Sequence, residues 1–195
     1  MDSLINHLLQ YGNLNEPQIE LIKSEVEVLS LEKDAYFSEA GKIANRVGFI
    51  RKGILRVCYY DKAGTEITRY FVDEHNFAVD LNSFQNRIPS GEYIQAIVPT
   101  DLYVFSAPSL QNLSATIIDW DRIVAKITSK ALMEKVNRIS PMLAEDAKIR
   151  YLAFFDRFPS LANRIPLHYL ASYIGITKHS LSRIRREISQ ENRQI

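Results

Sequence analysis

The 195-residue sequence predicts an α+β protein with three successive parts: a roll of short β-strands, a long helix and a group of short helices. Two observations support this division. Five of the seven glycines lie between residues 35 and 107, where apolar and β-branched runs are short and alternate with turns. From Ser109 onward the apolar residues follow a helical period instead. We therefore expect the parts to span residues 1–108, 109–146 and 147–195.

Composition is that of a folded, soluble protein, with 46% hydrophobic and 24% charged residues. No apolar run approaches the roughly 18 residues that span a bilayer, and no basic segment opens the chain as in a secretory signal. Cys58 is the only cysteine, so the chain cannot form an internal disulfide or bind an iron–sulfur cluster or structural zinc by cysteines alone. The sequence thus predicts a cytoplasmic protein without membrane contact, cofactor or metal.

The first part contains several short strands. The expected strands are residues 50–53, 55–60, 66–72 and 102–105, and Asp61–Gly64 forms a hairpin connection between two of them. A helix is expected before them, over residues 19–28. A meander of short strands is typical of a β-barrel or a β-sandwich.

The second part is predicted as one helix of roughly 30 residues, about 45 Å long. Its apolar residues are spaced 4, 3, 4, 3 and 4 apart, and they are Leu113, Ile117, Trp120, Val124, Ile127 and Ala131. A second run, Leu132, Val136, Ile139 and Leu143, repeats the spacing after a slip of one position. Such a helix either packs on its own roll or pairs with the same helix of a second copy. The length of the repeat favours the homodimer, with the first six residues at the interface.

Charge is divided unevenly along the chain. Residues 148–195 carry nine Lys/Arg and three acids, while the remaining 147 residues carry 15 Lys/Arg and 20 acids. A basic tail on an acidic body indicates that the tail contacts a polyanion.

The most specific pattern lies between Leu167 and Arg186, which read as a helix-turn-helix. Ala171 is small enough for two helices to cross closely, Gly175 allows the left-handed turn residue, and Thr177 can cap the second helix. The apolar residues that would close a small core are Leu170, Ile174, Ile176, Leu181 and Ile184. The joint occurrence of these features predicts a helix pair that binds double-stranded DNA.

The exposed side of the second helix follows from a rotation of about 100° per residue. Opposite the apolar side stand His179, Ser182, Arg183 and Arg186, with Lys178 beside them. Arg183 is suited to a bidentate contact with guanine, and Lys178 to guanine or phosphate. Thr177, Ser180 and the backbone N–H groups at the helix start suit phosphate oxygens, as does Arg186.

With these motifs in place, the chain resembles the Crp/Fnr family of bacterial transcription regulators over nearly its whole length. The resemblance rests on Tyr36-Phe-Ser-Glu-Ala-Gly41, on Gly48-Phe-Ile-Arg-Lys-Gly53 with the following Ile-Leu-Arg-Val57, and on Asp61-Lys-Ala-Gly64. It implies a cyclic-nucleotide-binding-like β-roll or jelly roll, a dimerisation helix, and a winged-helix-like DNA-binding domain. In that domain Lys178, His179 and Arg183 match the three base-reading positions. The few residues after Arg186 leave the wing short or absent.

Two departures from the family pattern affect function. Members that bind cyclic AMP carry a Gly-Glu pair and an Arg followed by Ser or Thr, whereas this chain has Asn76-Phe-Ala-Val-Asp80 and places Ser90 at the Arg position. Arg87 lies three positions earlier, where a shift of the loop would be needed to replace it. Burying a phosphate without a cation is costly, so we expect an effector other than cyclic AMP. The second departure is His179, where many relatives have Glu, which predicts different preferred bases.

The sequence therefore predicts a sequence-specific transcription regulator that binds DNA as a homodimer, with RNA polymerase and an unidentified small-molecule effector as further partners. The alternative is a ligand-binding or catalytic β-barrel whose tail does not read DNA. Against an enzyme, His75 is the only histidine between residues 35 and 107, where the strands are expected, and no catalytic motif is recognised. Cys58 is expected to be a packed thiol.

Overall fold

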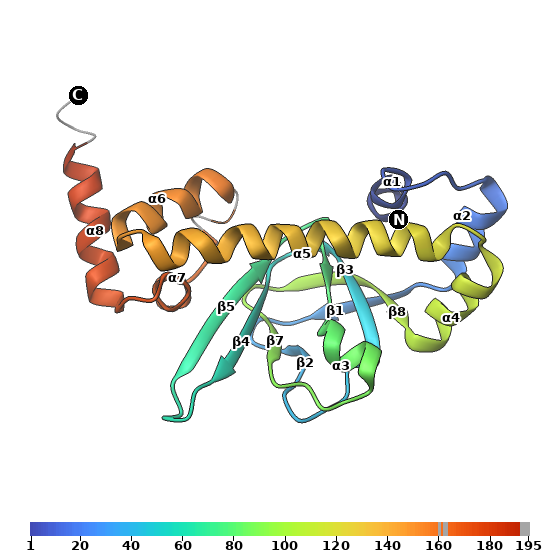
Figure 1. Cartoon of the computed structure of the whole chain (residues 1–195), viewed down its shortest axis with the longest axis horizontal. Helices are drawn as coiled ribbons and strands as arrows, with labels where there is room; N and C mark the ends of the chain where they lie inside the picture. The colour runs from blue at the N-terminus through green and yellow to red at the C-terminus, as the bar shows by residue number, and fades with distance from the viewer. Residues whose placement is uncertain (160, 162–163, 192–195) are drawn as a thin grey trace.

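The computed structural model describes residues 1–159, 161 and 164–191, without the side chains of 137–144 and 157. It confirms the α+β class. Two four-stranded antiparallel sheets form a roll, and α5 runs along one side of it from the N-terminal helices to the C-terminal helices (Figure 1). The helices are α1 (Asp2–Leu9), α2 (Glu16–Ser24), α3 (Leu81–Asn86), α4 (Ala107–Thr116), α5 (Trp120–Ala144), α6 (Ala147–Arg157), α7 (Leu167–Ile174) and α8 (Lys178–Glu191).

The two sheets enclose an apolar core. The first sheet has the order β1-β8-β3-β6 and the second β2-β7-β4-β5. The strands are β1 (Glu27–Leu31), β2 (Tyr36–Ser38), β3 (Arg46–Lys52), β4 (Leu55–Tyr60), β5 (Glu66–Val72), β6 (Phe77–Ala78), β7 (Tyr93–Ala96) and β8 (Thr100–Ser106). Alternate residues of facing strands, such as Ile50, Val57, Ile94 and Leu102, are almost fully buried between the sheets.

The strands expected from sequence are found, with β4 and β5 at the expected residues. The helix expected over residues 19–28 is wrong in its second half, because α2 ends at Ser24 and β1 begins at Glu27. The strand prevails because β1 pairs with β8 along its whole length, from Glu27 opposite Val104 to Leu31 opposite Thr100. Hydrogen bonding across the sheet outweighs a weak local helix preference.

The single long helix expected within residues 109–146 is interrupted. Ile117 has an extended backbone (φ −102°, ψ 107°), which ends α4 before α5 begins at Trp120. The interruption turns Leu113, Ile117 and Trp120 into one apolar cluster with α1, α2 and β8, and it leaves Ile118 97% exposed. Burial of three large side chains offsets the loss of helical hydrogen bonds at one bend.

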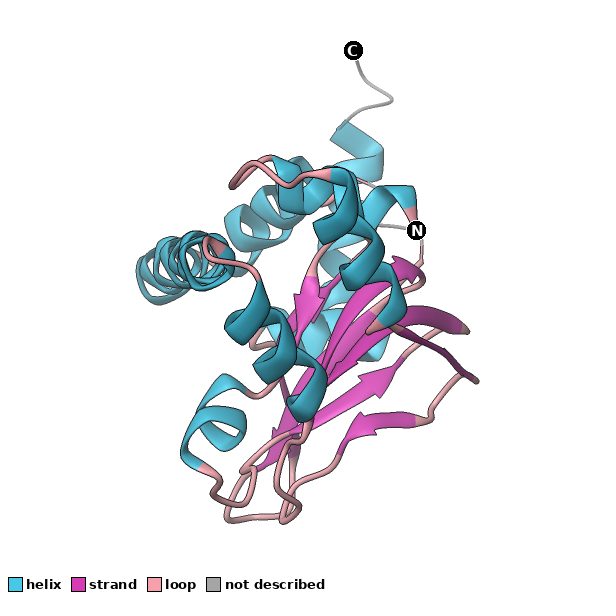
Figure 2. Cartoon of the chain, turned by 90° about the vertical axis from the view of Figure 1, so that its right-hand side faces the viewer, coloured by secondary structure: helices cyan, strands magenta, loops and turns pink. Residues whose placement is uncertain are grey.

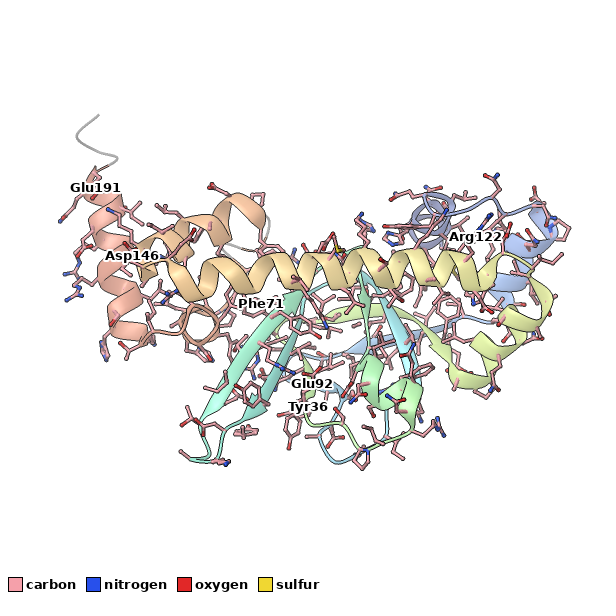
Figure 3. The ribbon with its side chains drawn as sticks, in the orientation of Figure 1. Tyr36, Phe71, Glu92, Arg122, Asp146 and Glu191 are labelled. Atoms are coloured by element: carbon pink, nitrogen blue, oxygen red, sulfur yellow. The ribbon has the colours of Figure 1, made fainter. Side chains whose placement is uncertain are left out.

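The C-terminal helices lie at the far end of α5 (Figure 1). Asp146 marks the joint between α5 and α6 in Figure 3, and its carboxylate accepts hydrogen bonds from the N–H groups of Lys148 and Ile149 (2.8 and 2.9 Å). Viewed from the end of the molecule that carries the N-terminal helices, α5 is seen end-on beside the sheets (Figure 2).

Gly53 joins β3 to β4 at a point where no other residue fits easily. Its φ is +110°, and an added Cβ would lie 2.7 Å from the Thr100 Cα and 2.8 Å from the Pro99 carbonyl oxygen. We expect Gly53→Ala to lower the free energy of unfolding by about 1–3 kcal/mol, since both backbone strain and contact with backbone atoms oppose it. Gly91→Ala is the control, because nothing lies within 4 Å of an added Cβ there. Urea denaturation of the two variants measures the difference, and equal stabilities would contradict this account of the turn.

Candidate nucleic-acid interface

The turn between α7 and α8 is closed by backbone hydrogen bonds. Gly175 adopts a left-handed conformation (φ 78°, ψ 36°), which lets its N–H bond to the Ser172 carbonyl and the Ile176 N–H to the Ala171 carbonyl (3.1 and 3.0 Å). These bonds satisfy the last carbonyl groups of α7, and glycine makes the left-handed residue easy to adopt. The sequence prediction for Gly175 is confirmed.

Thr177 caps the second helix as expected. Its Oγ1 accepts a hydrogen bond from the Ser180 N–H at 3.1 Å and lies 3.0 Å from the Ser180 hydroxyl. The two hydroxyls that were expected to bind phosphate are therefore engaged with each other and with the helix start. The remaining free N–H groups of the first turn of α8 are the donors that an anion could reach there.

A small core holds the two helices together. Ala171 is 2% exposed, so its methyl group lies within the helix crossing rather than on the surface. The apolar residues expected to close this core do so, and they are Leu170, Ile174, Leu181 and Ile184, with Ile176 packed against them. Burial of these residues leaves the opposite side of α8 as its solvent face.

That solvent face carries residues expected to contact DNA. Lys178, His179, Ser182, Arg183 and Arg186 are all exposed, and we call these five residues the reading face. The Arg183 side chain is 77% exposed and has only a distant ion pair with Glu187, with 3.8 Å between Nε and Oε1. Because α8 stands at the end of the molecule, no other described element covers its outer side (Figure 1).

The helix face expected to form the dimer interface is only partly available. Leu113, Ile117 and Trp120 are at most 3% exposed within their own chain, so they cannot also form an exposed seam. Ile127 is partly buried in the same cluster, while Val124 (40% exposed) and Ala131 face solvent. The physical reason is that the first apolar run packs on the chain's own roll, which was the alternative left open by the sequence.

The second apolar run takes a different direction. Leu132 and Val136 are 50% and 64% exposed, and with Val124 they form what we call the outward stripe. A slip of one position turns a helix by about 100°, so the second run does not continue the buried side of the first. The other two members of this run, Ile139 and Leu143, lie outside the described side chains.

A hollow of about 720 Å³ lies between α3, the second sheet and α5. Its lining includes Arg69, Asp80, Glu92, Leu132 and Lys135. Arg69 is paired with the Glu92 carboxylate at 2.7 Å. An anion in this hollow would therefore meet carboxylates as well as cations, and the arginine would have to leave its partner to bind it.

Asp80, one of the residues named for the cyclic-nucleotide cassette, lines this hollow, and Arg87 and Ser90 are next in sequence to the lining residues Asn86 and Gly91. Ser90 is 4% exposed and donates its hydroxyl to the Asp80 carboxylate at 2.6 Å. Arg87 follows α3 in a left-handed conformation (φ 54°) and is exposed. The position where the family carries an arginine thus holds a hydroxyl already bound to an acid, which disfavours a phosphate.

No candidate metal centre is found among the described residues. They contain no group of three His, Cys, Asp or Glu side chains that could hold a metal ion, and no helix among them is long and apolar enough to cross a bilayer. Cys58 is 1% exposed, and burial raises the pKa of its thiol to about 11. It is the packed thiol that the sequence predicted.

Solved structures with the same architecture cover nearly the whole chain. CLP of Xanthomonas campestris matches 91% of this chain and 93% of its own with a TM-score of 0.72 and 15% identity. FixK2 of Bradyrhizobium japonicum matches 86% of both chains with a TM-score of 0.72 and 15% identity. A Crp/Fnr-family protein from Eubacterium rectale matches 91% of this chain and 85% of its own, with a TM-score of 0.69 and 17% identity.

The chain has the Crp/Fnr fold. The match includes both the roll and the C-terminal helices, as the shares of the chain covered require. No protein-family model matches the sequence, and no curated protein does. At 15–17% identity these similarities establish the Crp/Fnr fold, while the function of this chain has to be argued from its own residues.

The Thr177 cap offers a test of the helix pair that does not require DNA. We expect Thr177→Ala to lower the free energy of unfolding by about 1 kcal/mol, because the Ser180 N–H loses its acceptor at the start of α8. Thr177→Ser keeps an oxygen in place and serves as the control, with stability close to that of the parent protein. Denaturation followed by circular dichroism measures both, and an alanine variant as stable as the serine variant would contradict the cap.

Proposed function

We propose that this protein is a sequence-specific DNA-binding transcription regulator of the Crp/Fnr type that acts as a homodimer in the cytoplasm. The observation that carries the proposal is the reading face: five polar or cationic side chains exposed on the second helix of a complete helix-turn-helix. A helix of this kind enters the major groove and presents its N-terminal residues to base edges. The basic tail adds contacts to phosphate.

The roles within the reading face follow from chemistry and position. Arg183 contacts guanine through its two-pronged guanidinium, and Lys178 contacts guanine or phosphate. His179 donates to a base acceptor, and Ser182 lies beside it on the same face. Arg186, one turn further along, contacts phosphate together with the N–H groups near Thr177 and Ser180.

The homodimer is supported by the outward stripe. Val124, Leu132 and Val136 are apolar and lie on the exposed side of a 25-residue helix, where an isolated soluble chain gains nothing from them. Pairing of this stripe with the same stripe of a second copy would bury all three. It would also place two copies of α8 to bind half-sites about 34 Å apart on a near-palindromic site.

An effector would act from the hollow beside α3. Leu132 of the outward stripe also lines that hollow, as does Lys135, so a bound molecule would contact the helix that pairs the copies. The pairing of Arg69 with Glu92 and of Ser90 with Asp80 supports an effector other than cyclic AMP. RNA polymerase is a further partner for a regulator that activates transcription.

Two arginines of the reading face should differ in what their loss does. We expect Arg183→Ala to cost about 1–3 kcal/mol at one base position and to relax the preference there. Arg186→Ala should weaken binding to all sequences similarly. It should also reduce the slope of the logarithm of affinity against the logarithm of salt concentration by about one, as the loss of one phosphate contact requires. Selection of bound duplexes from a random pool, followed by titration at several salt concentrations, measures both effects. A protein that selects no sequence, with either arginine present or absent, would refute the proposal.

The outward stripe predicts the oligomeric state. We expect Val136→Glu to shift the protein toward the monomer, because two buried carboxylates would face each other across the pair. Val28→Glu is the matched control, since Val28 is also a valine with a similar exposed fraction, 63% against 64%. Sedimentation equilibrium distinguishes the two variants. A Val136→Glu protein that remains a dimer would place the interface elsewhere.

A further inference from the structure

One cation of the roll is buried beneath the C-terminal helices. Arg56, on β4, is only 1% exposed. Its Nη1 and Nη2 donate to the two carboxylate oxygens of Glu66 at 2.8 and 2.7 Å, and Nη2 also donates to the Gln95 side-chain carbonyl at 2.7 Å. The hydrogen bonds from Arg56 hold the pKa of Glu66 below its ordinary value, so the pair is ionised near neutral pH. The guanidinium is therefore fixed in one plane on the outer side of the second sheet.

Helix α7 covers that plane. The Tyr169 ring lies over the guanidinium, with 3.7 Å between the Arg56 Cζ and the ring centroid. One turn further along α7, the Ser172 hydroxyl accepts a hydrogen bond from the Thr68 N–H of β5 at 2.9 Å. Phe71, at the end of β5, packs its ring against Tyr173 with 5.5 Å between centroids. Figure 3 shows Phe71 at this junction of the sheet with the C-terminal helices.

The opposite end of α7 is bound by Arg150 of α6. The Arg150 Nε donates to the Ile174 carbonyl at 3.0 Å, and its Nη1 donates to the Glu145 carbonyl at 2.5 Å. Ile174 is the last residue of α7, and Glu145 follows the last residue of α5. Helix α7 thus contacts a cation of the roll near its start and an arginine of α6 at its end, and the same arginine bonds to the joint between α5 and α6.

These contacts position α8 without covering it. Tyr169 and Ser172 face the sheet, whereas the reading face lies on α8 and is exposed. A planar cation stacked on an aromatic ring is favourable only while the two planes stay in contact, and it is worth more when water is excluded. If α7 moved away, Arg56 would keep Glu66 but lose the ring that shields its face.

We propose that Arg56, acting through Tyr169, is a positioning residue for DNA recognition: it seats α7 on the roll and thereby sets the direction in which α8 meets the operator. The proposal rests on the proposed function. It assigns to the outer side of the second sheet a role in the geometry of the operator complex. In the proposed dimer, the contact between Tyr169 and Arg56 sets the distance between the two reading faces. That distance determines the half-site spacing that the protein accepts.

The test compares Tyr169→Ala with Tyr169→Phe in the full-length protein. Phenylalanine keeps the ring over Arg56, whereas alanine removes it. The first readout is hydrogen exchange of the Thr68 amide without DNA, because that amide of β5 donates a hydrogen bond to the Ser172 hydroxyl of α7. The second readout is affinity for the selected operator, for the same operator with one or two base pairs inserted between the half-sites, and for random-sequence DNA.

We expect Tyr169→Ala to exchange faster at Thr68, to bind the operator about tenfold more weakly and to discriminate less against the altered spacings. Its affinity for random-sequence DNA should not change, because the reading face and its charges are intact. Tyr169→Phe should match the parent protein in every measurement. Arg56→Lys, which keeps the charge but not the planar face, should match Tyr169→Ala and leaves the sequence of the C-terminal helices unaltered.

Two controls show that the folded parts survive. Trp120 is 3% exposed in a separate cluster, so its fluorescence reports on the roll and its N-terminal helices, and exchange of the Leu181 amide reports on α8. If Tyr169→Ala disturbs the Leu181 amide, the comparison is decided by Arg56→Lys.

Three results would overturn the proposal. They are unchanged exchange of the Thr68 amide in both Tyr169→Ala and Arg56→Lys, tighter operator binding by Tyr169→Ala, or a Tyr169→Phe variant that behaves like Tyr169→Ala. Failure of the parent protein to select any DNA refutes the proposed function and with it the positioning role. In that case faster exchange of the Thr68 amide in Tyr169→Ala would still establish that the contact between Tyr169 and Arg56 holds α7 against the roll.

Discussion

The arrangement of the whole molecule depends on the contact between the second sheet and the C-terminal helices. Those helices are short, with 11, 8 and 14 residues, and so small a unit buries little apolar surface by itself. Their core is completed by the roll, because Ile54, Phe71 and Ile97 belong to the same buried cluster as Phe154 and Leu181. The part that carries the reading face is therefore stabilised by the roll.

Polar contacts add direction to this apolar contact. Arg164, just before α7, pairs with both carboxylate oxygens of Glu74 at 2.6 and 3.0 Å, and Glu74 also accepts the Gly53 N–H. Burial would raise the pKa of Glu74, but these hydrogen bonds outweigh it and hold the pKa below its ordinary value. Apolar packing tolerates sliding, whereas paired charges and stacked planes define one orientation. The roll and the C-terminal helices are thus joined in a defined way along the length of α7.

The long helix serves two surfaces in turn. Its first part buries Trp120 and Ile123 against the N-terminal helices and the first sheet, and its later part exposes Leu132 and Val136. The change of side follows from the slip of one position in the apolar spacing. The same helix can therefore belong to the core of one chain and, in the proposed homodimer, to a contact between two chains.

Sequence alone determined the features that depend on residues close together in the chain. Ala171, Gly175 and Thr177 predicted the helix-turn-helix because a tight turn imposes its requirements within a few positions, and the apolar and β-branched runs at residues 55–60 and 66–72 predicted β4 and β5. Tertiary structure decided which surface each apolar run covers: Leu113, Ile117 and Trp120 pack inside their own chain and bend the helix, although their spacing equally suits a partner helix. It also decided the burial of Arg56, which looks like an ordinary strand residue until α7, more than a hundred positions later, closes over it. Spacing along a chain records which residues share a side, but only packing in three dimensions determines what lies against that side.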